Sequence, residues 1–508
     1  MEVKKSRIKI CSLLLLGIAT FLTPLSLSAD DDLDDIELLD LDLDLNALEK
    51  AEKENTRALI NPITAAHLGF FFEEIKLNEP LWTTTKPEKG RDILYLMPSK
   101  ITSIEYGGGS CNLFFNMTPK MHLTGGNLLN IDQVDPVKLA EQLNIVAAAN
   151  PAFAAFARDP KQAGSLLPFI KKITIQERKI GPYFQAGLAH KAFMLQFHTS
   201  LQLAERNFWL NKHDLEEVRA LNQIIFGDNQ QYDESNLYRI RVGLGDTRVK
   251  LGLNALNAKK IQTDVGLECI IPTSRSTKKL LPEADVDHQL RDDATLFSTA
   301  VNSLLNVRDY LLTPEIGNGG HFGLGFYLEG KVNLFHNLAE LITRVSFDKF
   351  FEADEQRLML QKRTTTFNDL AGAVNDLEAQ ERVIAFAKQH LLPLPYRVSI
   401  EPGGIFNGIM IVHIPYKKWS FRYGYDFYFQ QAERFKQIYA SPQVLPLLNS
   451  ELAHVGTIIQ HKISSETTYR IKNFNNINLD IGFGGDTTIS AHNIGKDWTF
   501  YLKFASEF

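Results

Sequence analysis

The chain contains little cysteine, with only three in 508 residues. Cys11 lies in an N-terminal segment that we expect to be removed, which would leave Cys111 and Cys269. Two cysteines are too few for the disulfide framework that small exported proteins use in place of a large core. After residue 29, no apolar stretch reaches the length of about 18 residues that marks a spanning helix. We therefore expect no helical membrane span.

Motifs for metals and cofactors are also missing. The 13 histidines include no His-x-x-x-His or His-Glu-x-x-His spacing on a helical stretch, which argues against a metal centre. Gly-x-Gly occurs at 243–245 and 323–325, but neither copy continues into the phosphate-binding fingerprint or opens a helix. We therefore expect no metal, no cofactor and no enzyme activity.

The N-terminus has the three parts of an export signal. A positive region precedes the apolar run Leu13–Leu22, and small residues follow at Ser26–Ala29. Because the apolar run is shorter than a spanning helix, we interpret residues 1–29 as a cleaved signal peptide, with a retained membrane anchor as the alternative. The positive residues are Lys4, Lys5, Arg7 and Lys9.

Charge limits the partners of the mature chain. Residues 1–29 hold four cations and one anion, a net +3, so their removal takes the net charge from −6 to −9. An acidic chain argues against nucleic acid as a partner. Residues 30–62 form an Asp/Leu-rich acidic segment, which cannot bury its leucines without burying carboxylates. We expect this segment to be disordered, as a solvated tail or, alternatively, a site for cations or a partner.

From residue 63 to residue 508 the main pattern is period-2 alternation, which is typical of β-strands. In residues 193–203, phenylalanine and leucine occupy one face and polar side chains the other. Residues 417–430 carry an entirely aromatic apolar face. A soluble β-sandwich would also alternate, but these strands run to about 9–13 residues, as membrane strands require.

These features predict an all-β chain with helical insertions, folded as an antiparallel transmembrane β-barrel of about 12–16 strands. Membrane barrels have short periplasmic turns and longer outer loops, and the connections follow that rule except for a long one at 204–236, which falls on the periplasmic side. Either a further strand lies near Arg206–Leu210, or this segment is a periplasmic or lumenal helix. The short connections are 257–260, 335–338 and 415–416, and the long ones are 272–320, 348–404 and 431–451. The helical insertions are expected near 135–176, 213–227, 293–312 and 367–392.

The last residues, WTFYLKFASEF, place aromatic and aliphatic side chains on one face of a strand that ends in phenylalanine. This pattern resembles the C-terminal assembly signal of Gram-negative outer-membrane proteins. The resemblance implies insertion into the bacterial outer membrane, with outer-membrane lipid, the barrel assembly machinery and periplasmic chaperones as partners. The assembly-signal residues are Trp498, Phe500, Leu502, Phe504 and Phe508.

Residues 242–273 and 314–332 carry a second resemblance. A Gly-Leu-Gly-Asp sequence at 243–246, interpreted as a turn, is followed by a strand, by Pro272-Thr273 at the end of the next strand, and by a Gly-rich entry into a third. This order resembles the putative MetA-pathway phenol-degradation group of outer-membrane proteins. The resemblance implies a barrel of the channel or transporter kind and supplies no catalytic residues. Ser274 stands where that group has glycine, and the helical insertions and acidic tail depart from it.

His198 and Ser200 share one face of a strand and resemble the His-x-Ser pair of outer-membrane phospholipase A. In that chemistry the histidine is the base and the serine the nucleophile. Leu201 and Gln202 follow here where that family has asparagine and glycine. A barrel lipase is therefore only a remote alternative, and a polar pair inside the barrel is the favoured interpretation.

Charged side chains of both signs fall on the polar faces of the expected strands. They predict either a solute or ion filter or lateral ion pairs that stiffen the wall. We expect an outer-membrane channel or uptake port for small solutes, gated or plugged by helical segments, with a surface structural or adhesive barrel as the alternative. The pore-lining candidates are Arg239, Arg241, Arg248, Lys250, Asp264, Glu268, Glu329, Lys331, Lys418, Arg422, Asp426 and Asp480.

Overall fold

The computed structural model describes residues 109–124, 174–208, 212, 216, 237–258, 261–274, 308–334, 338–364, 385, 388–389, 393–474 and 477–507. All of them belong to one compact unit, Ile60–Glu507. The expected signal peptide at 1–29, the acidic segment at 30–62 and Phe508 lie outside the described residues. None of the helices in the described part of the chain is long and apolar enough to cross a membrane.

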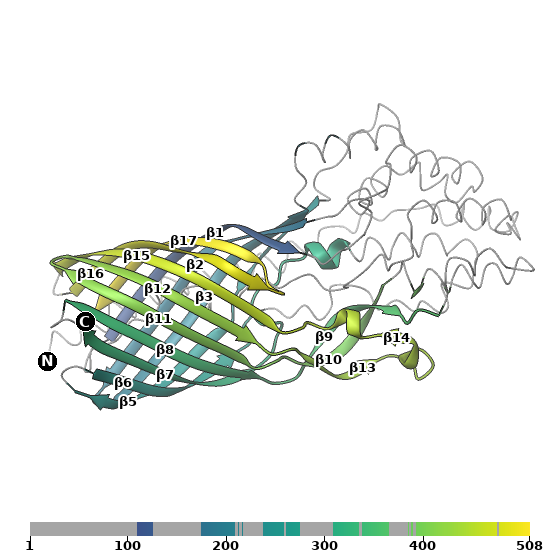
Figure 1. Ribbon diagram of the computed structural model, residues 1–508, viewed down its shortest axis with the longest axis horizontal. Coiled ribbons are helices and arrows are strands. Elements are labelled where there is room, and N and C mark those ends of the chain that lie inside the picture. The colour runs from purple at the N-terminus through teal and green to yellow at the C-terminus, as the bar shows by residue number, and fades with distance from the viewer. Residues whose placement is uncertain are drawn as a thin grey trace, which may run out of the picture. The chain divides into compact units, whose positions relative to one another are not determined.

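Long antiparallel strands form one closed sheet (Figure 1), in the order β2-β1-β17-β16-β15-β12-β11-β8-β7-β6-β5-β3-β4, and pairing of β2 with β3 closes it. The strands are β1 (Gly109–Thr124), β2 (Thr174–His190), β3 (Phe193–Phe208), β4 (Tyr238–Leu244), β5 (Thr247–Asn257), β6 (Ile261–Ile271), β7 (Gly323–Leu334), β8 (Ala339–Phe350), β11 (Ile405–Tyr416), β12 (Trp419–Gln430), β15 (Ile458–Phe474), β16 (Ile477–His492) and β17 (Lys496–Glu507).

Strands β4 and β5 share one place in the wall, so the barrel has 12 strands. Both pair with β3: Leu244 lies opposite Leu201, and Arg248 lies opposite His198. The register shifts by one residue between these two pairs, which marks a β-bulge at Gly245–Asp246. The predicted antiparallel barrel of 12–16 strands is therefore confirmed.

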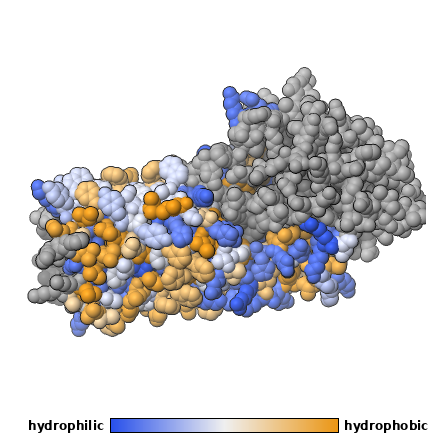
Figure 2. All heavy atoms as spheres, in the orientation of Figure 1, coloured by the Kyte–Doolittle hydropathy of each residue, from blue (hydrophilic) through white to orange (hydrophobic). Residues whose placement is uncertain are grey.

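Alternation sorts the wall into an apolar outside and a polar inside. In β17, the side chains of Phe500 and Leu502 are each 54% exposed, whereas the intervening Tyr501 is 3% exposed. A strand forms here because each apolar side chain can face lipid while its neighbours face the interior. Figure 2 shows apolar side chains over much of the visible barrel wall. This is the surface of a transmembrane barrel, as found in the bacterial outer membrane.

The two ends of the barrel differ in their connections. Short turns join β2 to β3, β5 to β6, β7 to β8, β11 to β12 and β15 to β16, all at the end where β17 finishes. In the first and fourth of these turns, Lys191 and Lys417 adopt positive φ angles of 53° and 57°. All the long connections lie at the other end. By the loop rule for membrane barrels, we name the short-turn end periplasmic and the other end outer.

The long connection at 204–236 was placed wrongly from the sequence. β3 continues to Phe208, and the connection from there to β4 leaves from the outer end. The error came from the Gly-Leu-Gly-Asp sequence at 243–246, which is a bulge and not a turn between two strands. Because β4 and β5 were counted as two strands joined by a turn, every connection earlier in the chain was assigned to the wrong end of the barrel. With the bulge in place, the long connections of the barrel follow the loop rule.

Most of each expected helical insertion lies outside the described residues. Of the segment at 293–312, residues 308–312 are described and helical, and single helical residues fall at 212, 216, 385 and 388–389. Of the segment at 135–176, only residues 174–176 are described, and they belong to β2.

A second, smaller sheet is built from two outer connections. It contains β9 (Ala353–Gln361), β10 (Leu394–Glu401), β13 (Arg434–Tyr439) and β14 (Leu448–Asn449), in the order β13-β10-β9-β14. Its core holds Met359, Val398, Ile400, Leu448 and Ala453. Two 3-10 turns, η5 (Leu445–Leu447) and η6 (Glu451–Ala453), complete it. We refer to it as the outer sheet.

Candidate channel lumen and outer mouth

The interior of the barrel is lined by polar and charged side chains. Eleven of the 12 predicted pore-lining residues lie on inward-facing positions of their strands. The bulge explains how Arg239 and Arg241 in β4 and Arg248 and Lys250 in β5 can all face inward, because odd positions before it and even positions after it share one face. Lys418 differs: it lies in the turn after β11, with Nζ 5.9 Å from the ring centroid of Tyr469.

One buried ion-pair cluster joins β5, β6 and β8. Glu268 lies at its centre and is 1% exposed. Its Oε1 is 2.7 Å from Arg248 Nη1 and 3.7 Å from Lys250 Nζ, and its Oε2 is 3.6 Å from Arg344 Nη2. Arg248 also reaches Asp348 at 3.3 Å. Charges buried in a wall must be paired to be tolerated, and here neighbouring strands supply the partners.

Tyr327 of β7 fills the space beside this cluster. The Arg344 guanidinium lies 4.9 Å from its ring centroid and the Lys250 ammonium 5.7 Å, both at cation–π distance. The ring lies flat over the neighbouring strands, since a Cβ at Gly252 or Gly266 would come within 2.4–2.6 Å of it. Glycine is required at both positions because any side chain there would displace the tyrosine.

A second cluster lies across β12, β15 and β17. Lys503 Nζ is 3.0 Å from Glu466 Oε1, the Tyr501 hydroxyl donates to Glu466 Oε2 at 2.9 Å, and Arg422 Nη1 is 3.5 Å from the same carboxylate. Glu466 was not among the predicted residues, because β15 has a weak apolar alternation around Ser464 and Ser465. Only its register opposite Arg422 identifies the inward face.

Near the outer end two sets of interior ion pairs are buried almost completely. Lys462 forms ion pairs of 2.7 Å with both Asp486 and Asp497, and the side chains of Lys462 and both carboxylates are 0% exposed. Arg206 of β3 pairs with Glu177 of β2, and their side chains are 2% and 0% exposed. None of these residues was predicted, although all lie at alternating polar positions of long strands.

At the periplasmic end the same kinds of pair are more accessible. Arg470 makes two hydrogen bonds to Asp480, at 2.8 and 2.9 Å, with side chains 41% and 18% exposed. Glu340 joins Lys331 at 3.0 Å and His413 Nδ1 at 2.8 Å. The side chains of Lys331, Glu340 and His413 are 28%, 18% and 16% exposed. Solvent therefore reaches the lumen at this end.

Residues 308–322, which we call the strap, run from the described helical turn to the start of β7 along inward-facing side chains of the barrel wall. Arg206 Nη1 donates to the carbonyl oxygen of Thr313 at 3.1 Å, and Arg239 Nη2 lies 2.8 Å from Asp309 Oδ1. Leu311 and Leu312 are buried, at 1% and 0% exposed. The wall thus holds the first half of the strap inside the outer end.

The second half of the strap turns through three glycines. Gly317, Gly319 and Gly320 have φ angles of 73°, 72° and 88°, a region that favours glycine. Asp246, in the bulge of the wall, accepts hydrogen bonds from the Asn318 backbone N–H and from the Ser274 hydroxyl, both at 2.7 Å. The bulge therefore has a structural purpose, because it turns an aspartate toward the strap.

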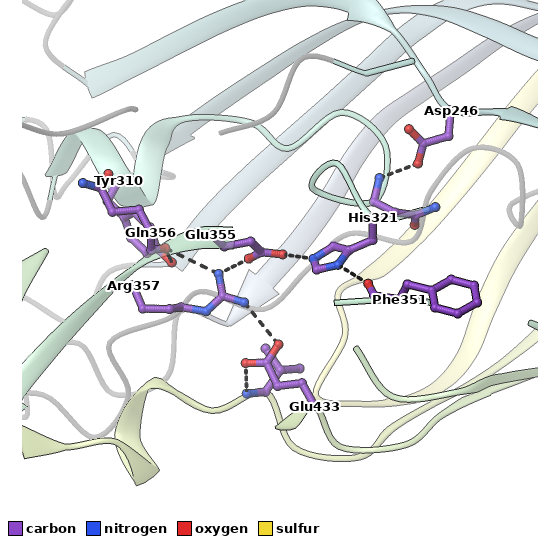
Figure 3. A network of polar contacts seen from close by, with 10 residues as sticks. Asp246, Tyr310, His321, Phe351, Glu355, Gln356, Arg357 and Glu433 are labelled. Carbon is purple, nitrogen blue, oxygen red and sulfur yellow. Dashed lines mark hydrogen bonds and ion pairs between the residues drawn. The ribbon is translucent and has the colours of Figure 1, made fainter. Parts of the chain in front are cut away.

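His321 ends the strap and connects it to the outer sheet (Figure 3). Its Nδ1 is 2.9 Å from the Phe351 carbonyl oxygen, and its Nε2 is 2.7 Å from Glu355 Oε1 of β9. Arg357 bonds to Glu355 and, at 3.1 Å, to Glu433, and Glu433 accepts from the Val455 N–H at 2.9 Å. Burial disfavours the charged guanidinium, but Glu355 and Glu433 outweigh it and raise the pKa of Arg357 above its usual range. We call the side chains of His321, Glu355, Arg357 and Glu433 the mouth network.

The contacts of His198 and Ser200 argue against a hydrolase pair. His198 Nδ1 lies 2.5 Å from the Tyr183 hydroxyl and its Nε2 lies 3.2 Å from Gln196 Oε1. Ser200 accepts a hydrogen bond from Gln202 at 2.8 Å. Both ring nitrogens thus have partners other than the serine, and the pair behaves as the polar lumen residues that the sequence favoured.

No protein-family model matches this sequence, and no curated protein matches it. The resemblance to the phenol-degradation group therefore stays a prediction. Among solved structures, the chain is similar to the COG4313 outer membrane channel from Pseudomonas putida F1, with 8% identity and a TM-score of 0.40 over 81% of this chain and 100% of that one. It is similar to the Pseudomonas putida toluene transporter TodX, with 8% identity and a TM-score of 0.30 over 84% and 98%. It is also similar to the transport unit of the Escherichia coli autotransporter AIDA-I, with 7% identity and a TM-score of 0.31 over 82% and 94%.

Proposed function

We propose that this protein is an outer-membrane channel or uptake port for small solutes, closed at its outer mouth by the strap. The observation that carries the proposal is the gradient of exposure inside the barrel. Charged lumen side chains are 16–41% exposed around His413, Lys331 and Arg470. They are 0–2% exposed around Lys462 and Arg206 at the outer end, where the pair of Arg239 with Asp309 on the strap is the exception at 35% and 37%. A polar interior that is wet at one end is what a gated pore requires.

The barrel size supports the same proposal. About eight strands already fill a barrel interior with side chains, and wider barrels enclose ligand cavities or channels. Twelve strands therefore leave room for more than the wall side chains. The strap occupies part of that room at the outer end, and its release would extend the wet lumen through the barrel.

Single-channel conductance of the purified protein in planar lipid bilayers tests the proposal. We expect low or intermittent conductance for the full chain and higher conductance after deletion of residues 280–312, which removes the start of the strap. Charge reversal at Arg422 or Asp480 should change ion selectivity, because both line the lumen toward its accessible end. Zero conductance in both the full chain and the deletion would contradict a channel.

A surface structural or adhesive protein is the second candidate. It is favoured by the outer sheet, which exposes Tyr439, Leu445 and Leu447 at 42%, 43% and 48%. Exposed apolar side chains on a part of the protein that faces solvent are a feature of binding surfaces. Zero conductance, combined with loss of cell adhesion when Leu445 and Leu447 are both changed to serine, would favour this candidate over the channel.

A further proposal follows from the sequence. We propose that the β17 side chains Trp498, Phe500, Leu502 and Phe504, with Phe508, guide insertion by the assembly machinery after periplasmic chaperones deliver the chain. The test is Phe508→Asp, which should lower the yield of heat-modifiable barrel in the outer membrane. A normal yield of folded barrel from Phe508→Asp would show that Phe508 does not guide insertion.

A further inference from the structure

His321 faces a backbone carbonyl, which can only accept hydrogen bonds, and the carboxylate of Glu355, which only accepts while its ion pair with Arg357 keeps it ionised. The Phe351 carbonyl oxygen is 2.9 Å from Nδ1, and Glu355 Oε1 is 2.7 Å from Nε2. A neutral imidazole carries one N–H and one bare nitrogen, so it can satisfy only one of these two acceptors. Both bonds form together when the ring carries both protons. The two distances therefore favour a ring that donates from both nitrogens.

The charge balance of the mouth network points the same way. Glu355 and Glu433 contribute two negative charges, and Arg357 between them contributes one positive charge. A protonated His321 would add a second positive charge beside these carboxylates, in a group whose four side chains are 1–6% exposed. Among the described residues, other charged or titratable groups that face the network include Glu315 and Tyr310 on the strap, which act on Arg357, and Asp246 on the wall, which holds Asn318.

The strap has little freedom to move while these bonds persist. A Cβ at Gly319 would lie 2.7 Å from Glu355 Oε1, and a Cβ at Gly317 would lie 2.6 Å from Asp246 Oδ1. The glycine turn is thus enclosed between a carboxylate of the outer sheet and a carboxylate of the barrel wall. Loss of the His321 contact would free the side of the turn that faces the sheet.

We propose that His321 and Glu355 form a proton-controlled latch, which holds the strap across the outer mouth while His321 carries both protons and releases it when the ring loses one. The inference rests on the proposed channel function for its physiological meaning, although the latch itself is a property of the strap. Loss of the proton to solvent leaves a nitrogen lone pair facing either a carbonyl or a carboxylate. An acceptor buried against an acceptor is unfavourable, so the closed arrangement weakens as the pH rises.

The experiment measures access to the strap without measuring conductance. In a chain whose Cys111 and Cys269 are changed to alanine, Ile316→Cys places a thiol at a strap position that is 3% exposed. The rate at which a water-soluble maleimide labels this thiol is measured at each pH. It is divided by the labelling rate of Lys418→Cys in the exposed periplasmic turn, which corrects for the intrinsic rise of thiol reactivity with pH. We expect this ratio to rise by about tenfold or more from acidic to alkaline pH, as one hydrogen bond to a charged group is lost.

Two variants locate the effect in the latch. His321→Gln and Glu355→Gln should each give a high ratio at every pH, because neither can form the charged pair. His413→Gln, in the matched pair with Glu340 at the periplasmic end, should keep the wild-type response to pH. Heat-modifiable electrophoretic mobility verifies that each variant is folded, and having two latch variants protects the test if one fails to assemble.

The outcomes separate the latch from the channel. A ratio that does not change with pH, or a pH response that survives both His321→Gln and Glu355→Gln, overturns the latch even if the protein conducts. A latch response in a protein that never conducts would leave the latch standing and reject the proposed channel. Conductance that rises with pH together with the labelling ratio, and loses that rise in both variants, supports both proposals.

Discussion

Among the described residues, two histidine–carboxylate pairs of nearly equal length lie at opposite ends of the barrel. His321 and Glu355 are 2.7 Å apart at the outer mouth, and His413 and Glu340 are 2.8 Å apart near the periplasmic end. The side chains of the first pair are 1% and 4% exposed, and those of the second are 16% and 18% exposed. Distance alone would give both pairs the same importance. Burial separates them, because water can replace a lost partner only at the accessible end.

The same contrast holds for the other charged groups of the lumen. The outer pairs of Lys462 and Arg206 are made by side chains that are 0–2% exposed, whereas the periplasmic pairs around Arg470 and Glu340 are 16–41% exposed. The pair of Arg239 with Asp309 on the strap is the exception at the outer end, at 35% and 37% exposed. We infer that the outer half is organised for closure and the periplasmic half for passage. Removing equivalent interactions from the two halves should therefore have unequal consequences.

The largest expected effect is at Arg206. Changing Arg206→Met leaves Glu177 paired with Lys179, at 2.8 Å, and removes the bond to the Thr313 carbonyl. Breaking a buried ion pair costs about 3–5 kcal/mol when one charge stays buried without a partner, and the retained Lys179 lowers that cost here. We expect the temperature of conversion from folded to unfolded electrophoretic mobility to fall, with conductance increased as the strap is released. Unchanged thermal stability would show that the outer half is not closed as described.

A charge reversal in the periplasmic half should change selectivity with little loss of stability. Asp480→Lys places a cation beside Arg470 in the accessible lumen. We expect the reversal potential in a salt gradient to move toward greater anion preference, because the local field at the entrance becomes positive. The measurement is made in planar bilayers beside Ile481→Lys, which introduces the same charge on the outside of the wall. Equal shifts in both variants would mean that Asp480 does not face the conducting path.

A smaller effect is expected at Arg470. Although Arg470→Ala removes two hydrogen bonds to Asp480, the arginine side chain is 41% exposed. Solvent-exposed ion pairs contribute about 0–1 kcal/mol, so thermal stability should hardly change. A loss as large as that of Arg206→Met would erase the contrast between the two ends.

The smallest effect is expected on the outer surface. Hydrogen bonds from Lys349 and Lys436 lower the pKa of Glu401, at the end of β10, to about 2. The stabilisation from these ion pairs is therefore fully present at pH values above about 4.5, the ordinary pKa of glutamate, and is lost as the pH falls through about 2. Because Glu401 is near the surface, Glu401→Gln should leave thermal stability at neutral pH almost unchanged. A marked loss would indicate that this bridge, and not the barrel, anchors the outer sheet.

The barrel wall could be predicted from the sequence because strand alternation is a local property. Inward and outward faces follow from period 2, and so 11 of the 12 lumen candidates lie on inward-facing positions. The bulge at Gly245–Asp246 was harder, since alternation is intact on each side of it and Gly-Leu-Gly-Asp suits a turn equally well. A signal was present: Arg239 and Arg248 are polar at positions of opposite parity.

The mouth network could not be predicted in the same way. His321 and Glu355 are 34 residues apart, and their contact depends on how the strap folds back against the outer sheet. Nothing in the periodicity of either segment indicates that they meet. Glu466 was missed for a different reason, because the neighbouring serines and threonines of β15 hide its alternation. Contacts across loops and weakly amphipathic strands are where sequence patterns carry little information.

The most direct test compares solvent access at two depths of one lumen. Lys331→Cys, near the periplasmic end, and Ser346→Cys, deeper in β8 and 5% exposed, are labelled separately with a water-soluble maleimide in the background without Cys111 and Cys269. A lumen open only at the periplasmic end predicts fast labelling of Lys331→Cys and slow labelling of Ser346→Cys, with the latter accelerated by Glu355→Gln. Equal rates at both depths in the unaltered mouth, with no effect of Glu355→Gln, would contradict a lumen closed at the outer end by the strap.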